Sequence, residues 1–160
     1  MSTNFVFLNN LKGYPVTGRM MILALIIGIH ANSFAQQDSA DIRKTALNYI
    51  EGWYEGNAER MERALHPELA KRIVSSDKQS GKSRLGQMSA LTLINGTKSG
   101  GGKDTPPEKQ QKDVTILDIY RGAASVKVVA SDWIDYLHMA KWNGEWRIVN
   151  VLWEVKGEGK

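Results

Sequence analysis

The hydrophobic residues of this chain change their spacing near residue 96, and this change constrains the fold more than any other feature. Up to that point apolar residues recur at intervals of three and four, which is the pattern of a helix with one buried face. From Val114 onward they form β-branched and aromatic runs, which are typical of strands. Helices followed by strands predict an α+β domain in which helices cover one face of a curved antiparallel sheet.

Four helices are expected in the first part of this domain. The first begins after Asp38 or Ser39, either of which can accept a backbone hydrogen bond at a helix start. Its apolar positions share one face: Ile42, Ala46, Tyr49, Ile50 and Trp53. Gly56-Asn57 ends it, because these residues adopt a positive φ readily. The later spacing predicts shorter helices over residues 58–65, 68–74 and 85–95, with a polar loop over 75–84.

Four strands are expected in the second part, over residues 114–120, 124–131, 133–142 and 146–155. Asn143-Gly144 separates the last two, and this dipeptide between apolar runs is a strong hairpin signal. The preceding segment, residues 96–111, contains three consecutive glycines and Pro106-Pro107, which support neither a helix nor a central strand. We therefore expect an irregular connection between the helical and the strand-rich parts.

Residues 1–35 have the three parts of a secretory signal peptide. Lys12 and Arg19 supply positive charge, residues 20–29 are uninterrupted apolar, and Ser33 and Ala35 are small residues at the −3 and −1 positions. Ten apolar residues span about 15 Å as a helix, half of a bilayer core. A buried core helix is the alternative, and the polar residues after the run argue against it. We expect cleavage after Ala35, a mature domain of residues 36–160, secreted or periplasmic localisation and no stable membrane anchor.

The composition excludes several classes of function. Loss of residues 1–35 would lower the formal net charge from +4 to +2, which is too mild to indicate a nucleic-acid partner. The chain has no cysteine, so disulfides, thiolate metal sites and a lipidated cysteine are excluded. The mature chain must therefore depend on an apolar core, which a single domain of this size can build.

Familiar catalytic motifs are missing. Gly81-Lys82-Ser83 and Gly102-Lys103 suggest a phosphate loop, but Ser76 and Thr97 stand where its first glycine is required. The histidines form no compact metal-binding pair, and no serine lies in a Gly-x-Ser-x-Gly turn. We expect neither a metal ion nor a cofactor.

The strand predicted over residues 133–142 carries polar residues on both faces. Alternation places Asp135 with Trp133 and Leu137 on one face, and His138 with Tyr136 on the other. A mixture of apolar bulk and a few polar groups is how a small-molecule pocket is lined. The alternative is that His138 is a hydrogen-bonded structural residue and that the tryptophans belong to the core.

Three segments carry a resemblance to a known family. They are Ala-Leu-Asn-Tyr-Ile-Glu-Gly-Trp-Tyr-Glu-Gly-Asn over residues 46–57, His-Pro-Glu-Leu over 66–69, and Asp-Tyr-Leu followed by Gly-x-Trp-x-Ile-Val-Asn over 135–150. With them, residues 38–155 resemble the nuclear transport factor 2-like superfamily, specifically its lumazine-binding branch, which is close to the SnoaL-like polyketide cyclases. The resemblance implies a cone: a strongly bent sheet wrapped around three to four helices, with an apolar cavity at its wide end. It also implies a homodimer formed through the sheet.

Three functions follow from these patterns. The favoured one is an exported domain that binds a small apolar or aromatic ligand, with these candidate lining residues: Tyr49, Trp53, His66, Tyr136, His138 and Trp153. The second is a lyase or isomerase, since the resemblance implies that an Asp or His in the cavity moves protons on a bound carbonyl compound. His138, Asp135 and Tyr136 are its candidate catalytic residues, although alternation separates His138 from Asp135. The third is an interaction module in which Trp133, Trp142 and Trp153 form an interface patch.

Overall fold

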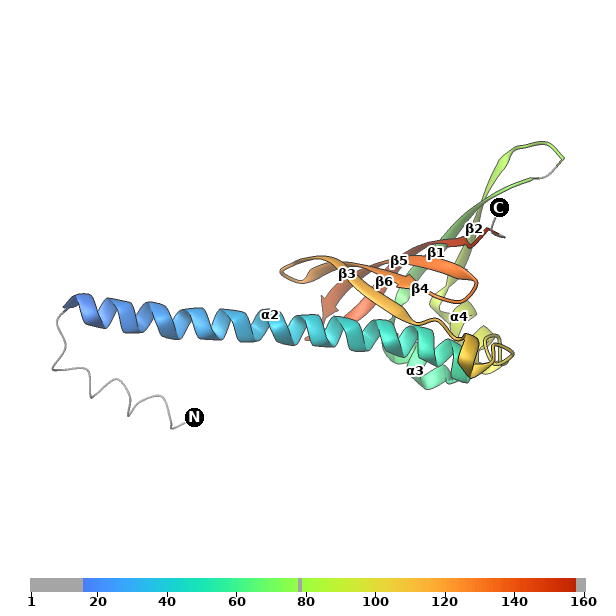
Figure 1. Cartoon of the computed structure of the whole chain (residues 1–160). Helices are drawn as coiled ribbons and strands as arrows, with labels where there is room; N and C mark the ends of the chain where they lie inside the picture. Colours follow the sequence, from blue (N-terminus) through green and yellow to red (C-terminus); the bar gives the residue numbers. More distant parts are fainter. Residues whose placement is uncertain (1–15, 78, 158–160) are drawn as a thin grey trace. The chain divides into compact units, whose positions relative to one another are not determined.

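The computed structural model describes residues 16–77 and 79–157, with side chains from residue 36 onward (Figure 1). The chain divides into two units, residues 1–38 and residues 39–160, and the second holds the helices and strands considered below. The predicted signal peptide, residues 1–35, lies outside the residues whose side chains are described, so its cleavage stays a prediction.

The first helix begins at Val16 and not after Asp38 or Ser39 as expected, whereas its end and the second helix follow the prediction. Helix α2 spans Val16–Glu55, and within residues 39–55 its buried face carries Ile42, Ala46, Tyr49 and Ile50, as the spacing predicts. The helix stops at Gly56, whose φ is +63°. Asn57 then caps helix α3, Ala58–Ala64, by accepting a hydrogen bond of 3.1 Å from the backbone N–H of Arg60.

Six strands form one sheet in the order β2-β1-β6-β5-β4-β3. Their bounds are β1 Leu65–Ser76, β2 Ser83–Ser89, β3 Asp113–Tyr120, β4 Ala123–Val129, β5 Trp133–Trp142 and β6 Glu145–Val155. Neighbouring strands are antiparallel except β1 and β6, which are parallel. The α+β class is confirmed, but the sheet is mixed where we expected antiparallel pairing throughout.

One of the expected helices is wrong, and another begins later than expected. Residues 68–74 lie in β1, and residues 85–89 lie in β2, so that helix α4 begins only at Ala90 and ends at Lys98. Ser89 caps α4 by accepting a hydrogen bond of 3.2 Å from the N–H of Thr92. β1 is paired on both sides, with β2 and with β6, and this pairing overrides a short apolar pattern that fits either a strand or a helix.

The second half of the chain matches its prediction more closely. The four expected strands correspond to β3–β6, and β5 and β6 are joined through Asn143 and Gly144, both with positive φ. Between α4 and β3 the chain is largely irregular and contains one short 3-10 helix, Pro107–Lys109.

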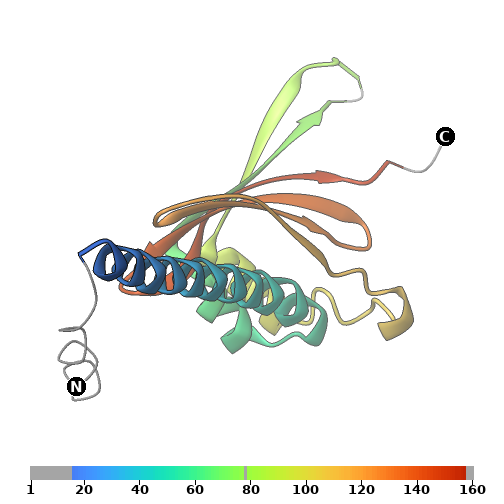
Figure 2. The same cartoon turned by 60° about the vertical axis from the view of Figure 1, so that its left-hand side comes forward.

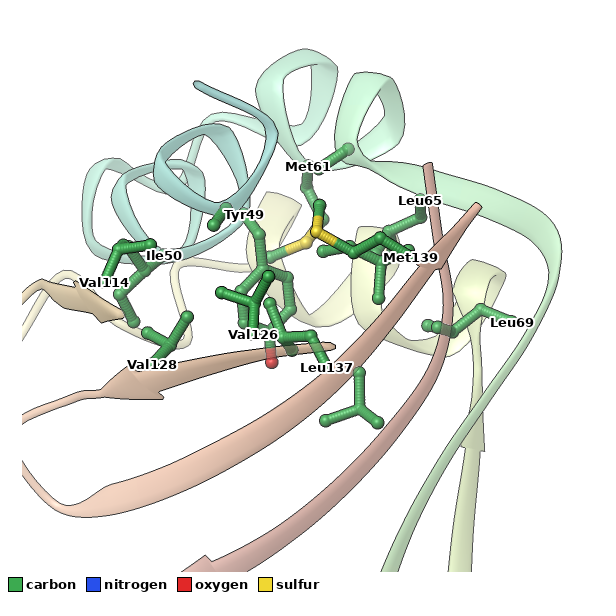
Figure 3. Close-up of a cluster of buried hydrophobic side chains, with 14 of the residues drawn as sticks. Tyr49, Ile50, Met61, Leu65, Leu69, Val114, Val126, Val128, Leu137 and Met139 are labelled. Atoms are coloured by element: carbon green, nitrogen blue, oxygen red, sulfur yellow. The ribbon is translucent and has the colours of Figure 1, made fainter. Parts of the chain in front are cut away.

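The core lies between the helices and one face of the curved sheet (Figure 2). Figure 3 shows side chains of α2 and α3, among them Ile50 and Met61, packed against Val128 of β4 and Met139 of β5. Every second residue of β4 and β5 points into this core, which places Asp135 of β5 in the same inward row as Leu137. One inward position of β5 is therefore charged.

Candidate functional site

A buried ion pair joins β1 to β5 on the inner face of the sheet. The Nζ of Lys71 lies 2.5 Å from Oδ1 of Asp135, and the two side chains are 5% and 0% exposed. Strand β6 lies between the two strands, so the pair bridges three strands of the sheet. Alternation explains both positions, because Lys71 follows the inward Leu69 by two residues and Asp135 precedes the inward Leu137 by two.

Two aromatic side chains complete the hydrogen bonding of this carboxylate. Tyr49 of α2 donates its hydroxyl to Oδ2 of Asp135 at 3.1 Å and accepts a hydrogen bond of 2.7 Å from Lys71 Nζ. The indole N–H of Trp133 also donates to Oδ2 of Asp135, at 2.7 Å. Three donors therefore converge on one buried carboxylate, so that both of its oxygens are hydrogen-bonded.

Aromatic rings enclose the ammonium group. Lys71 Nζ lies 5.4 Å from the ring centroid of Tyr49 and 4.8 Å from that of Trp153, distances at which a cation is attracted to the ring face. The indole N–H of Trp153 is buried and has no hydrogen-bond partner among the described residues. A buried donor without an acceptor costs about 1–3 kcal/mol. We call the five residues Tyr49, Lys71, Trp133, Asp135 and Trp153 the polar centre.

Burial changes the acid–base properties of two of these groups. It lowers the pKa of Lys71, although the nearby Asp135 carboxylate opposes this. It raises the pKa of Tyr49 well above its ordinary value, and the charge of Asp135 raises it further. At neutral pH Tyr49 is therefore a fixed hydrogen-bond donor, whereas Lys71 releases its proton more readily than a surface lysine.

The structure brings together only part of the predicted site. Tyr49, Asp135 and Trp153 belong to the polar centre, and Trp53 packs edge-on against Trp133 with ring centroids 6.2 Å apart. His66 lies apart from this centre, at the beginning of β1, with its ring packed edge-on against Trp142 at 4.8 Å, and it lines the larger of the two cavities described below.

His138 and Tyr136 point away from the polar centre. Both are exposed on the outer face of β5, and His138 Nδ1 lies 3.2 Å from Nδ2 of Asn150 on β6. The predicted acid–base pair of His138 and Asp135 therefore does not form. Strand alternation separates the two residues, and the irregularity in β5 comes only after His138, so no bend reunites them.

The sequence reasoning missed Lys71. This residue falls in the segment expected to be a helix over 68–74, where it would have been one of several exposed charges. In a strand, the same segment places Lys71 between the inward Leu69 and Ile73. The sequence feature that could have identified Lys71 is therefore a lysine at an inward position of an apolar strand face.

Two cavities open near the turn between β5 and β6. The larger, of about 650 Å³, is lined by side chains from α3, α4, β1 and the β5–β6 turn. The smaller, of about 370 Å³, lies between the β5–β6 turn and the residues of α2 from Asp41 to Asn48.

Within the described part of the chain, no three His, Asp or Glu side chains are grouped as a metal ion would require. None of the described helices has the length and apolar character needed to cross a membrane.

One protein-family model matches most of the chain. A model of the family described as "Putative lumazine-binding" matches residues 37–154. The chain belongs to this family. No curated protein matches significantly.

Solved structures confirm the nuclear transport factor 2-like fold of this lumazine-binding family member. A protein of unknown function from Silicibacter pomeroyi is 16% identical, with a TM-score of 0.58 over 76% of this chain and 98% of its own. Another from Shewanella baltica is 19% identical, with a TM-score of 0.59 over 76% and 96%. A hexachlorocyclohexane dehydrochlorinase is 6% identical, with a TM-score of 0.50 over 77% and 88%. At these identities the likeness shows the fold alone.

Proposed function

We propose that this protein binds a small planar organic molecule at the polar centre, whose five residues line neither of the two cavities described above. The observation that carries the proposal is the burial of two charged side chains, Lys71 and Asp135, in a mainly apolar interior. A buried ion pair costs several kcal/mol of desolvation per ion, and an apolar pair of similar volume is often equally stable. Folding alone therefore does not require these charges, whereas recognition of a polar ligand does.

The groups of the polar centre suit a flat heterocycle. The indole of Trp153 offers a ring face and an N–H donor, and Lys71 and Asp135 offer a donor and an acceptor. The family description names lumazine, a planar pteridine whose ring carries both carbonyl and N–H groups. Its carbonyl oxygens would accept from Trp153 and Lys71, and a ring N–H would donate to Asp135.

Lumazine is therefore the probe for this proposal. We expect saturable binding, measured as quenching of lumazine fluorescence, with about tenfold or greater loss of affinity in the double variant Lys71→Met/Asp135→Asn. The double variant removes both charges together, so that neither remains buried without its partner. Arg72→Met is the matched control, since Arg72 is the next residue along β1 and its guanidinium reaches Asn150.

Two results would contradict the proposal. One is the absence of saturable binding by lumazine and by other planar heterocyclic diones. The other is equal affinity in the wild type and in a folded Lys71→Met/Asp135→Asn variant, because the ligand would then lie elsewhere.

A second candidate function is acid–base catalysis at the same centre, as in a lyase or isomerase acting on a cyclic carbonyl compound. The lowered pKa of Lys71 favours it, because an amine that releases its proton more readily than a surface lysine is better suited to act as a base. Lys71 would take the role that the sequence suggested for His138. Exchange of the α-hydrogens of a cyclic ketone with deuterium, followed by NMR, should then be accelerated by the wild type and not by Lys71→Met.

We further propose that the protein binds its ligand outside the cytoplasm. The predicted signal peptide supports export, and the mild charge expected after cleavage agrees with a small-molecule ligand in place of a nucleic acid. The family resemblance supports a homodimer.

A further inference from the structure

We propose a second ligand site in this protein, at the two cavities beside the β5–β6 turn, for an amphipathic organic anion with an apolar body and one carboxylate. The larger cavity has a volume of about 650 Å³, within the range of small-molecule sites. None of the five residues of the polar centre lines either cavity. The site is therefore separate from the polar centre.

The walls of the larger cavity are mainly apolar. Leu65 and Ala90 are buried beneath it, while Leu91 of α4 and Trp142 of β5 line it with side chains that are 66% and 54% exposed. Two large exposed apolar side chains facing one hollow are uncommon on a protein surface without a binding role. The charged side chains of this cavity balance, with two arginines and two glutamates. An uncharged, apolar part of a ligand fits it best.

The smaller cavity continues the larger one, because both are lined by Arg63, Glu145 and Arg147. Its lining has three cations and two anions, with Lys44 added to the two arginines and Asp41 to the glutamate. The excess positive charge lies at the end of an apolar cavity. This arrangement matches a ligand that carries its negative charge at one end.

Of the two arginines that line both cavities, Arg63 is the better placed to receive that charge. Arg147 is already engaged, since its guanidinium donates to the carbonyls of Glu62 and Arg63 at the end of α3 and pairs with Glu145 at 2.5 Å. Arg63 instead meets Glu59 at 4.0 Å, with both side chains largely exposed, which is a weak interaction. Its guanidinium can therefore turn to a carboxylate at little cost.

Decanoate is the probe for this site, and decanol is its uncharged counterpart. We expect saturable decanoate binding to the purified protein by calorimetry, accompanied by a shift of the Trp142 indole N–H signal in the NMR spectrum. Arg63→Gln should weaken decanoate binding about tenfold and leave decanol binding unchanged, because it removes only the charge. Leu91→Gln should weaken both ligands, since it removes the apolar wall.

Leu85→Gln is the matched control, because Leu85 is as exposed as Leu91 but lies in β2, away from both cavities. It should bind both ligands as the wild type does. The proposal is overturned if decanoate does not bind saturably, if Leu91→Gln and Leu85→Gln behave alike, or if Arg63→Gln weakens decanol as much as decanoate. These results are independent of lumazine binding, so failure at one site leaves the other standing.

Discussion

Lys71 and Asp135 meet at 2.5 Å across β6, the strand that separates their own strands in the sheet. The two residues are distant in the sequence, since 64 positions separate them along the chain. The contact exists because the parallel pairing of β1 with β6 brings an inward lysine beside an inward aspartate. The energetic and acid–base predictions for the domain follow from this relationship.

Removal of one partner should destabilise the domain strongly. Asp135→Asn leaves the ammonium of Lys71 buried without a counter-charge, and we expect a loss of about 3–5 kcal/mol in the free energy of unfolding. The double variant Lys71→Met/Asp135→Leu should recover most of this loss, because it buries no charge. Urea denaturation measures both. A single Asp135→Asn variant as stable as the wild type would show that the pair is not buried in solution.

The raised pKa of Tyr49 predicts a loss of stability at alkaline pH. Above the ordinary tyrosine pKa of 10.0 the unfolded chain loses the Tyr49 proton while the folded state keeps it. The unfolded state is then favoured by about 1.4 kcal/mol per pH unit. The stability advantage of the wild type over Tyr49→Phe should therefore be constant below pH 10 and shrink above it.

This comparison also separates Tyr49 from Lys71. The pKa of Lys71 is lowered in the folded state, so its contribution to stability rises with pH towards the ordinary lysine value of 10.5. Both proteins retain Lys71, and its contribution largely cancels in their difference. An advantage that stays constant from pH 9 to pH 11 would contradict the assignment for Tyr49.

Two glycines should be required for the position of Trp53. A Cβ at Gly102 would lie 2.5 Å from the carbonyl oxygen of Trp53, and one at Gly101 would meet its indole ring. We expect Gly102→Ala to cost about 1–3 kcal/mol of stability. It should also weaken lumazine binding, because Trp53 packs against Trp133, which donates to Asp135. Gly122→Ala is the control, since its Cβ would meet the Lys141 side chain at an ordinary 3.7 Å.

The outer face of the sheet should form a homodimer. Tyr136 of β5 and Leu152 of β6 lie opposite each other in the register and are about half exposed, at 45% and 51%. Light scattering should show a dimer for the wild type and a monomer for Leu152→Glu, which places a charge in this patch. A clean wild-type monomer at high concentration would contradict the prediction.

Lumazine binding by His138→Ala should equal that of the wild type, because His138 is on the outer face.

Export predicts a defined mature chain. When the full-length gene is expressed in a host with a secretory pathway, the intact mass of the recovered protein should correspond to residues 36–160. Recovery of the full chain, with residues 1–35 retained, would exclude cleavage after Ala35. Replacement of Ala35 by a bulky residue such as Phe should block processing at this position.

Much of this architecture follows from local sequence patterns. The face of α2 from Ile42 to Ile50, the turn at Asn143-Gly144 and the strands β3–β6 lie where spacing and turn chemistry predict them. These elements depend on interactions within one helix or between strands adjacent in sequence, so a pattern of nearby residues is sufficient to specify them. The separation of His138 from Asp135 follows from the same rule of alternation.

The polar centre and β1 depended on contacts that local patterns do not contain. Residues 68–74 have a spacing that suits a helix as well as a strand, and pairing with β2 and with the distant β6 selects the strand. That choice turns Lys71 inward to Asp135. The sequence alone thus established an α+β domain, its turns and the shared strand face of Asp135 and Leu137. Long-range strand pairing placed a buried lysine beside it, because pairing between distant segments is a property of the folded sheet.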